Sequence, residues 1–530
     1  MKFGVKRPIT GPWIPMLLAA VVHRSVLGDH FKHDDFIHLY QIANHGLAEF
    51  LLIPHGGHLL STSNFVFYLC YQVFGIDAAG YQAVSLATHL LNVWLLHNTV
   101  ERLTKRRGIA LLGSALWGMA PVAGGSIGWF SVYGHLLATT FILWVLRDMA
   151  SRRDGSEPIP GGILLCWYVL LLAAGTSFGV GLGVAATFGA VGWALLPDAS
   201  NRNRVAVTLG SLLGVLPLLF VLQHEVYDAL WGPLIADGRS AIQHLTRVTD
   251  LIGMWWRLLC FASAAVFLGL AIRKEHGHLP VDPFEGLEQE LSWLTDGVGL
   301  VLLVLIGWVL LRSDQRQRWL IAGLSLIALS AYGVIAAGRL GLMERAPSIL
   351  WMVGSPRYHY LGTLGVTLTA CAALGVALTR FSGFERWTEK WGGVTIALWI
   401  LAALPLNLYT ADLVTTREGL AARAVHQNLM ASIREAVKEK PVGAPVFIDN
   451  DPFKPVPMVV RKQFPGNAAV FVLSFPENMV DGRKVYFVEA KPSVHAAANR
   501  RPESRIARLL ITNPEKREIR RVWRLKRDAN

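Results

Sequence analysis

Long apolar blocks alternate with short basic segments along most of the chain. Blocks such as VAVTLGSLLGVLPLLFVL (205–222) and TIALWILAALPLNLY (395–409) approach the ~20 apolar residues that span a bilayer. The pattern predicts hydrophobic helices at residues 11–27, 81–98, 108–123, 130–147, 161–178, 180–197, 204–222, 251–272, 297–312, 319–338, 358–380 and 391–410. The predicted class is therefore an α-helical polytopic membrane protein.

The basic residues lie in the short segments between these blocks. Four such segments are ERLTKRR (101–107), RDMASRR (147–153), NRNR (201–204) and RSDQRQR (312–318). Lys and Arg concentrate in cytoplasmic loops, so this distribution accounts for much of the net charge of +13 without a nucleic-acid partner. Only 16% of the residues are charged and 53% are hydrophobic, which also favours a membrane protein over a nucleic-acid-binding one.

The charge rule predicts an orientation for the first helices and fails further along. With the amino terminus inside, residues 28–80 form an outer loop and ERLTKRR returns to the cytoplasm. Twelve crossings would nevertheless place RSDQRQR outside, so one crossing more or fewer is needed between 223 and 318. We therefore predict 11–13 transmembrane helices. A cleaved signal peptide is the alternative for 11–27, and an uncleaved first helix is preferred because many spans follow.

The composition changes near residue 411. A helical stretch at 411–440 precedes short β-like runs at 444–450, 469–475, 484–490 and 505–512, which Pro, Gly and Asn residues separate. The prediction is a transmembrane domain over 1–410 and a small α/β soluble domain over 411–530. Long domains are translocated largely regardless of charge, so the side of the membrane that holds this domain stays open.

The predicted first outer loop concentrates titratable groups. Residues 28–80 hold six histidines, five acids and one lysine. Asp34 and Asp35 stand together soon after the first helix, where a carboxylate would suit proton removal from an acceptor hydroxyl as a sugar leaves a lipid phosphate. The structural alternative is an acid pair that complements the dipole at a helix N-terminus.

Several stretches in order resemble one family. They are HDDFIHLY (33–40), GGHLLSTSNFVFYLCYQVFGIDAAGYQAVSLATHLLNVWLL (56–96), ALWGMAPVAGGSIGWFSVYGHLLATTFIL (115–143) and SPRYHYLGTLG (355–365). Together they resemble the GT-C superfamily of membrane glycosyltransferases, especially the bacterial relatives of protein O-mannosyltransferases. The resemblance covers about 10–150 and 316–380, and the rest matches only in hydropathy.

The resemblance implies roles for particular residues. Asp34 aligns with the family's catalytic acid and Asp35 with its second acidic position. The implied donor is a polyprenyl-phosphate sugar, and the implied acceptor is a protein, lipid or glycan on the extracytoplasmic side. No nucleic-acid partner is expected, because the basic residues follow the pattern of cytoplasmic loops. The substrate-binding candidates are Arg357, Tyr358, His58 and Arg345, where Arg345 and Arg339 are the alternatives to Arg357 as the phosphate contact. Interfacial anchoring beside Tyr358 and Tyr360 is the structural alternative for Arg357.

The chain departs from the family after the first loop. It has PHGGHL at 54–59, where many relatives have Arg-Pro. The motif GVGLGVA (179–185) lies inside a hydrophobic block, so close helix packing is preferred to dinucleotide binding.

A divalent metal is a further candidate ligand. His30, Asp34 and His38 would share a helix face, with His33 beside them, although histidines at a polar interface often serve only as hydrogen-bonding groups. The four cysteines form no CxxC pair.

A non-catalytic scaffold or a lipid-linked sugar transporter with a partner-binding C-terminal domain is the rival to the enzyme. Ion-coupled transport predicts ionisable groups within the spans, and the hydrophobic blocks hold few acids. The favoured location is the bacterial inner membrane, with the active site on the extracytoplasmic face.

Overall fold

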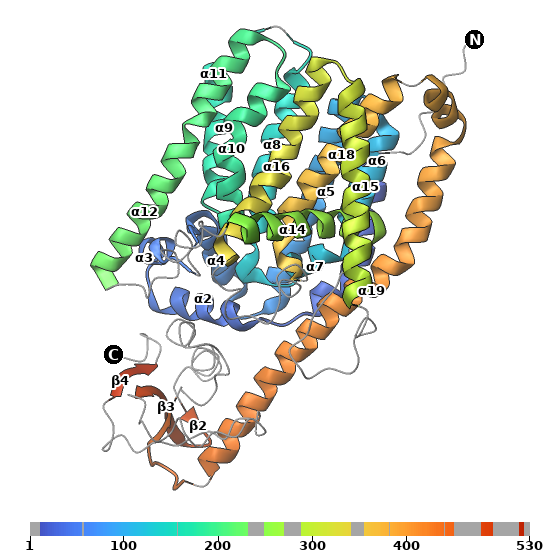
Figure 1. The fold of residues 1–530 in the computed structure, drawn as a ribbon. Coiled ribbons are helices and arrows are strands. Elements are labelled where there is room, and N and C mark those ends of the chain that lie inside the picture. Colours follow the sequence, from blue (N-terminus) through green and yellow to red (C-terminus); the bar gives the residue numbers. More distant parts are fainter. Residues whose placement is uncertain are drawn as a thin grey trace, which may run out of the picture. The chain divides into compact units, whose positions relative to one another are not determined.

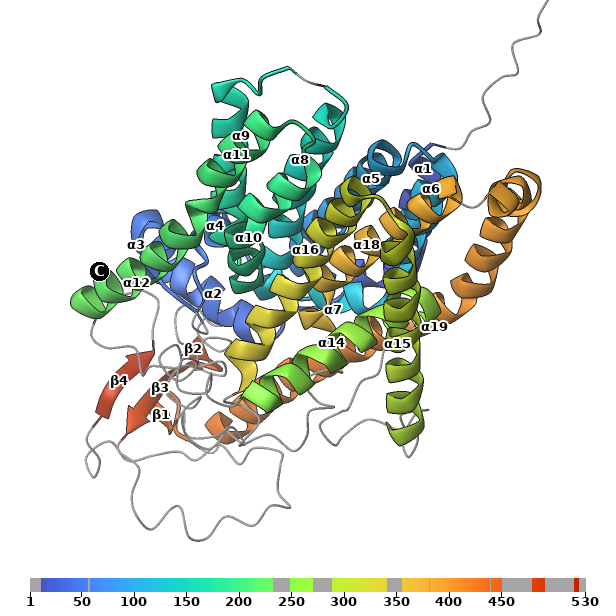
Figure 2. The same cartoon turned by 45° about the horizontal axis from the view of Figure 1, so that its top comes forward.

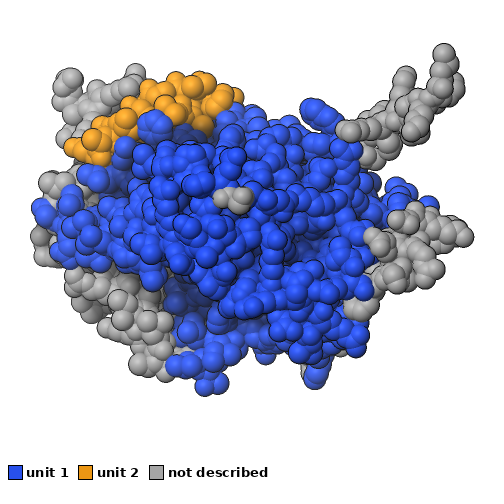
Figure 3. Space-filling view, turned by 90° about the horizontal axis from the view of Figure 1, so that it is seen from above, with its two compact units in different colours: residues 1–28, 51–66, 79–417 blue, residues 29–50, 67–78, 418–530 orange. Residues whose placement is uncertain are grey.

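The computed structural model describes residues 11–55, 58–155, 157–231, 248–269, 288–340, 355–380, 382–438, 440–449, 479–490 and 519–523. It divides into two compact units, which Figure 3 colours separately. Unit 1 contains 1–28, 51–66 and 79–417, and unit 2 contains 29–50, 67–78 and 418–530. Each unit is described by itself below.

Helices dominate unit 1 (Figure 1). They are α1 Trp13–Val22, α4 Ser61–Phe74, α5 Ala78–Thr104, α6 Arg107–Met119, α7 Gly124–Ile127, α8 Gly134–Arg152, α9 Gly161–Gly175, α10 Gly179–Leu195, α11 Ala199–Gly210, α12 Leu212–Trp231, α14 Val248–Leu268, α15 Glu288–Arg312, α16 Gln315–Arg339, α18 Tyr360–Arg380 and α19 Ser382–Lys438. Four 3₁₀ turns also belong to this unit, namely η1 Arg24–Gly28, η2 Pro121–Ala123, η3 Phe130–Val132 and η5 Pro356–Tyr358. Every apolar block predicted from the sequence overlaps one of the helices.

Many of these helices have the length and composition of membrane spans. Among the described residues seven qualify, or eight if the bent pair Arg107–Met119 and Pro121–Ile127 forms one span. Three more apolar helices are shorter, namely α1, α9 and α10. The predicted class, an α-helical polytopic membrane protein, is confirmed.

Small residues let the helices of unit 1 approach closely. Helices α8 to α12 pack on one another, and α16 packs against both α10 and α18 (Figure 2). A side chain at Gly183 of α10 would collide with Val334 of α16, and one at Gly365 of α18 would collide with the backbone of Ala328. The prediction that GVGLGVA serves helix packing is therefore confirmed.

A buried polar network joins α1, α5, α6 and α18. The carbonyl oxygen of Gly118 accepts the Nε2–H groups of His23 at 3.1 Å and of His89 at 3.0 Å. The Tyr360 hydroxyl donates to His89 Nδ1 at 2.8 Å and accepts from the Asn92 amide at 3.2 Å. These hydrogen bonds pair most of the polar atoms of the network inside an apolar bundle, where an unpaired group is costly, and His23 Nδ1 is the exception among them.

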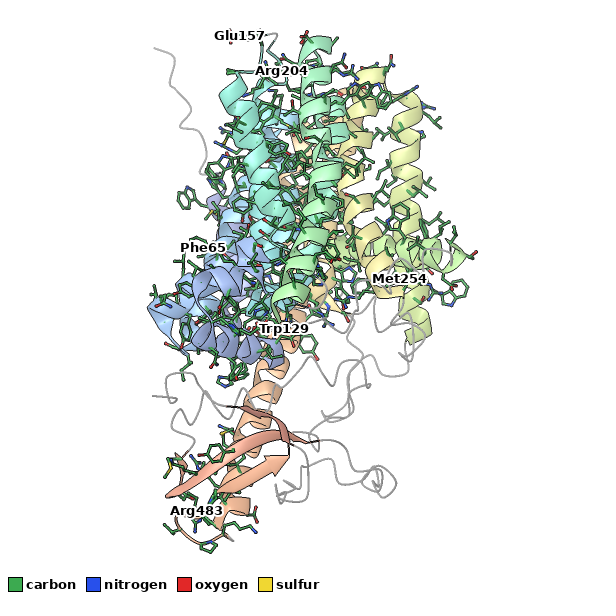
Figure 4. The ribbon with its side chains drawn as sticks, turned by 90° about the vertical axis from the view of Figure 1, so that its left-hand side faces the viewer. Phe65, Trp129, Glu157, Arg204, Met254 and Arg483 are labelled. Carbon is green, nitrogen blue, oxygen red and sulfur yellow. The ribbon has the colours of Figure 1, made fainter. Side chains whose placement is uncertain are left out.

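The basic segments gather at one end of unit 1. Arg316 donates to the carbonyl of Arg153 at 3.1 Å, and Lys105 pairs with Asp154 at 2.8 Å. Figure 4 shows Glu157 and Arg204 at this end, with Trp129 toward the other. RSDQRQR therefore lies beside the earlier basic loops, as the charge rule requires.

Helix α14 explains the conflict in the predicted number of crossings. It has the composition of a span, but Figure 1 shows it lying across the bundle, where it packs on α15, α16 and α18. Figure 4 shows its Met254 toward the Trp129 end. A helix in this orientation adds no crossing, which removes one of the twelve predicted crossings and leaves RSDQRQR on the inner side that the charge rule requires.

Unit 2 combines short helices with a small sheet. Its helices are α2 His33–Asn44, most of α3 Leu47–Leu52, the part of α4 from residue 67 onward, and the last part of α19. Strand β3 Arg483–Ala490 pairs in parallel with β1 Val446–Asp449, and antiparallel with β2 Met479–Val480 and β4 Ile519–Trp523. In the parallel pair Val446 lies opposite Val485.

The predicted C-terminal strands are tested in part. Strands β1 and β3 coincide with the predictions at 444–450 and 484–490, whereas those at 469–475 and 505–512 lie outside the described residues. Helix α19 continues through residue 410, so the predicted domain boundary there stays a prediction.

Candidate functional site

Two arginines and a tyrosine form the centre of the candidate site, at the end of unit 1 that carries Trp129. The guanidinium carbon of Arg357 lies 4.7 Å from the ring centroid of Tyr358, and that of Arg339 lies 5.3 Å from the same ring. Arg357 also lies 5.2 Å from the Trp129 ring and donates to the Tyr358 hydroxyl at 3.2 Å. We call Arg339, Arg357 and Tyr358 the arginine cluster.

Arg339 brings a positive charge to this cluster from the last turn of α16. Its side chain is half-buried, and its Nη2 lies 3.5 Å from Nε2 of His58. No carboxylate among the described residues forms an ion pair with it. A half-buried guanidinium beside a second one favours an anionic ligand, and the planar fork of arginine matches phosphate oxygens.

His58 is the neutral neighbour of the cluster. Its partial burial, together with the charge of Arg339, holds its pKa well below the ordinary value for histidine. It is therefore unprotonated near pH 7 and accepts the hydrogen bond from Arg339. Its ring lies 4.4 Å from that of Phe178, which in turn lies 4.1 Å from the ring of His135.

Close backbone contact fixes the segment that carries Arg357. The turn at α7 lies against η5, and Ser126 Oγ donates to the carbonyl of Arg357 at 3.3 Å. A Cβ atom at Gly125 would lie 2.6 Å from Cβ of Pro356 and 2.7 Å from the Arg357 nitrogen. Any side chain at position 125 would therefore require the backbone of η5 to shift.

Gly125→Ala is expected to displace η5 and to destabilise unit 1 by about 1–3 kcal/mol, as overpacking does. The measurement is the melting temperature of the purified full chain. The matched control is Gly253→Ala, because no atom lies within 4 Å of a Cβ built at Gly253 of α14. Equal melting temperatures for the two variants would contradict the close contact.

Asp34 and Asp35 lie in the first turn of α2, in unit 2, and differ in environment. Asp35 is fully buried, and its Oδ2 accepts the backbone N–H of Lys32 at 2.8 Å. This hydrogen bond caps the N-terminus of α2, where the structural alternative expected the acid pair to complement the helix dipole. Asp34 is partly exposed to solvent, whereas Asp35 is buried, so Asp34 is the more accessible of the two to a substrate.

The other predicted residues fall in different places. Arg345 lies outside the described residues. His30 and His38 contact aromatic rings, His30 with Phe36 and His38 with Phe67 at 5.2 Å, and the side chain of His33 is not described. Across the described part of the chain, no three His, Cys, Asp or Glu residues gather into a potential metal site. The metal prediction thus gains no support from these histidines.

Three residues of the site were not predicted from the sequence. Trp129, His135 and Phe178 reach the arginine cluster or His58 from η3, α8 and the start of α10. The only sequence signal was the tryptophan in the turn GSIGWF, which was noted as part of a resemblance and given no role.

The fold and site define an integral membrane protein with a cationic cluster at the end of the bundle opposite its basic loops. The chain is similar over 94% of its length to the crystal structure of ArnT from Cupriavidus metallidurans bound to undecaprenyl phosphate, of which 96% is covered. The identity is 12% and the TM-score 0.45, which is too distant to define the family of the chain. No family model and no curated protein matches it.

Proposed function

We propose that the chain is a membrane glycosyltransferase that moves a sugar from a polyprenyl-phosphate carrier to an acceptor hydroxyl. The observation that carries this proposal is the arginine cluster, two guanidiniums on one tyrosine ring, half-buried beside a neutral histidine. Such a cluster suits the phosphate of a lipid-linked donor. That the donor carries a sugar, and that this sugar is transferred, is inferred from the ordered motifs around the cluster, which resemble the GT-C superfamily.

In the proposed reaction the acceptor oxygen attacks the anomeric carbon of the donor. The bond from that carbon to the phosphate oxygen breaks, and the polyprenyl phosphate leaves with the electron pair. Asp34 takes the proton of the acceptor hydroxyl, while Arg357 and Arg339 balance the charge that grows on the phosphate. Asp35 holds the first turn of α2 through the N–H of Lys32 and does not take part in proton transfer.

The proposed side is extracytoplasmic. The arginine cluster adjoins Trp129, at the end opposite Glu157 and Arg204 (Figure 4), and basic loops mark the cytoplasmic end of a membrane protein. The bacterial inner membrane and the acceptor, whether protein, lipid or glycan, belong to the same proposal.

The test is a donor assay with the purified full chain in mild detergent. We expect release of polyprenyl phosphate from a panel of polyprenyl-phosphate sugars once the acceptor is supplied as a membrane extract, and no release from nucleotide sugars. Transport of an intact lipid-linked sugar between leaflets without release would favour the transporter. Donor binding without release or transport would favour the scaffold.

A further inference from the structure

Two arginines stand side by side near the basic end of unit 1, far from the arginine cluster. Arg102 lies in the last turn of α5, and Arg147 lies on α8. The two helices run in the same direction, because Asn92 accepts from Thr140 at 2.7 Å and Leu103 accepts from Arg153 at 3.1 Å. Arg147 lies over Trp94 of α5 and Arg153 reaches Leu103, so the end of α8 packs against the end of α5 that carries Arg102.

The carboxylates around these arginines are already engaged by other groups. Glu101 pairs with Arg107 at 2.8 Å, Asp154 pairs with Lys105 at 2.8 Å, and Asp148 pairs with Arg152 at 3.2 Å and accepts from Trp167 at 2.9 Å. Among the described residues, no acid forms an ion pair with Arg102 or Arg147. The two positive charges therefore have no ion pair of their own in the described part of the chain, and the one carboxylate that acts on Arg147, that of Asp148, is shared with Arg152 and Trp167.

Arg147 is partly taken out of water. Its guanidinium carbon lies 5.3 Å from the Trp94 ring centroid. Its Nε is buried and has no hydrogen-bond partner among the described residues. A buried donor without a partner is unfavourable, so an acceptor from a bound ligand would stabilise it.

The surface around the pair has the character of a membrane interface. Trp94, Asn98 and Arg102 follow one another at four-residue spacing and are all partly exposed, so they form one outward stripe of α5. Trp144, which is 45% exposed, lies one turn before Arg147 on α8. Tryptophans are enriched where acyl chains meet headgroups, and arginines just beyond them meet the phosphates.

We infer that Arg102 and Arg147 bind the phosphate of an anionic phospholipid headgroup, with Trp94 and Trp144 against its acyl chains. The ligand class is a phosphate diester in the leaflet at the basic end of the bundle. This site is separate from the arginine cluster, and it requires neither Asp34 nor a sugar donor.

The test measures the melting temperature of the full chain in mild detergent as phosphatidylglycerol is added. Phosphatidylcholine and sodium phosphate, each added alone, are the comparison ligands. We expect phosphatidylglycerol to raise the melting temperature, phosphatidylcholine to do so less, and sodium phosphate to have no effect. For Arg102→Gln/Arg147→Gln we expect the same rise to need about thirty times more phosphatidylglycerol.

The matched control is Arg202→Gln. Arg202 also stacks on a tryptophan, 3.7 Å from the Trp193 ring, but its Nε already donates to a backbone carbonyl at 2.9 Å. We expect this variant to respond to phosphatidylglycerol as the wild type does. If the double variant fails to fold, Arg102→Gln alone, at the helix end, is expected to show a smaller loss.

Three results would overturn the inference. One is an equal rise with phosphatidylcholine, which would indicate general solvation by lipid. Another is an equal rise with sodium phosphate, which would indicate a site for free anions. The third is an unchanged response of the Arg102 and Arg147 variants, which would show that the two arginines only anchor the helix ends.

Discussion

Asp34→Asn is expected to lower the rate of sugar transfer by about 10²–10⁴-fold, the usual contribution of a general base. The amide cannot accept the proton of the acceptor hydroxyl, whereas its size and shape are almost those of the carboxylate. Asp34 is partly exposed, and asparagine nearly keeps its size and shape, so the melting temperature of the variant is expected to stay near that of the wild type. The measurements are kcat with a polyprenyl-phosphate sugar and thermal unfolding of the same preparation.

Two neighbouring acids provide the controls. Asp35→Ala removes the acceptor of the Lys32 N–H, so we expect a loss of about 1 kcal/mol of stability, as for other lost N-caps. Glu49→Gln changes an acid that interacts with His45 at 3.1 Å, and it is expected to retain activity. If Asp34→Asn transferred sugar at the wild-type rate while Glu49→Gln did not, Asp34 would not be the base.

The helices were predictable because the bilayer imposes a length on them. Backbone N–H and C=O groups in the hydrocarbon of the bilayer must be hydrogen-bonded within the same segment, so each crossing needs a long apolar helix. The apolar blocks of the sequence therefore locate these helices well. Length and composition do not fix orientation, however. Helix α14 is as apolar as a span and lies across the bundle, which is why charge counting failed between 223 and 318.

The candidate site was predictable only in part. The pair at 34 and 35 left open a choice between chemistry and capping, and the backbone contact of Lys32 identifies Asp35 as the cap. Arg357 was predicted as a phosphate contact. That Arg357 and Arg339 both lie over the ring of Tyr358, however, depends on the packing of η5 beside the end of α16. Contacts between segments so distant in the chain leave no local periodicity, so the roles of Trp129 and Phe178 had no sequence signal that could identify them.

Arg357→Gln is expected to lower kcat/KM for the lipid-linked donor by about 10–100-fold. A hydrogen bond to a charged group contributes roughly 1.5–3 kcal/mol, and the amide keeps polarity but loses the charge. Arg357→Lys keeps the charge without the planar fork, so we expect an intermediate loss. Arg339→Gln is expected to act in the same way, because its guanidinium lies over the same tyrosine ring.

The double variant distinguishes a shared phosphate from two separate roles. If both guanidiniums bind one phosphate, the losses for Arg339→Gln and Arg357→Gln should not add, since residues that act on one group are coupled. Arg318→Gln is the matched control, because this exposed arginine donates to the Leu310 carbonyl at 2.9 Å at the basic end of the bundle. The opposite outcome is that the losses in melting temperature are fully additive and the KM for the donor is unchanged. The arginine cluster would then be an interfacial anchor, and the phosphate contact would have to be sought elsewhere.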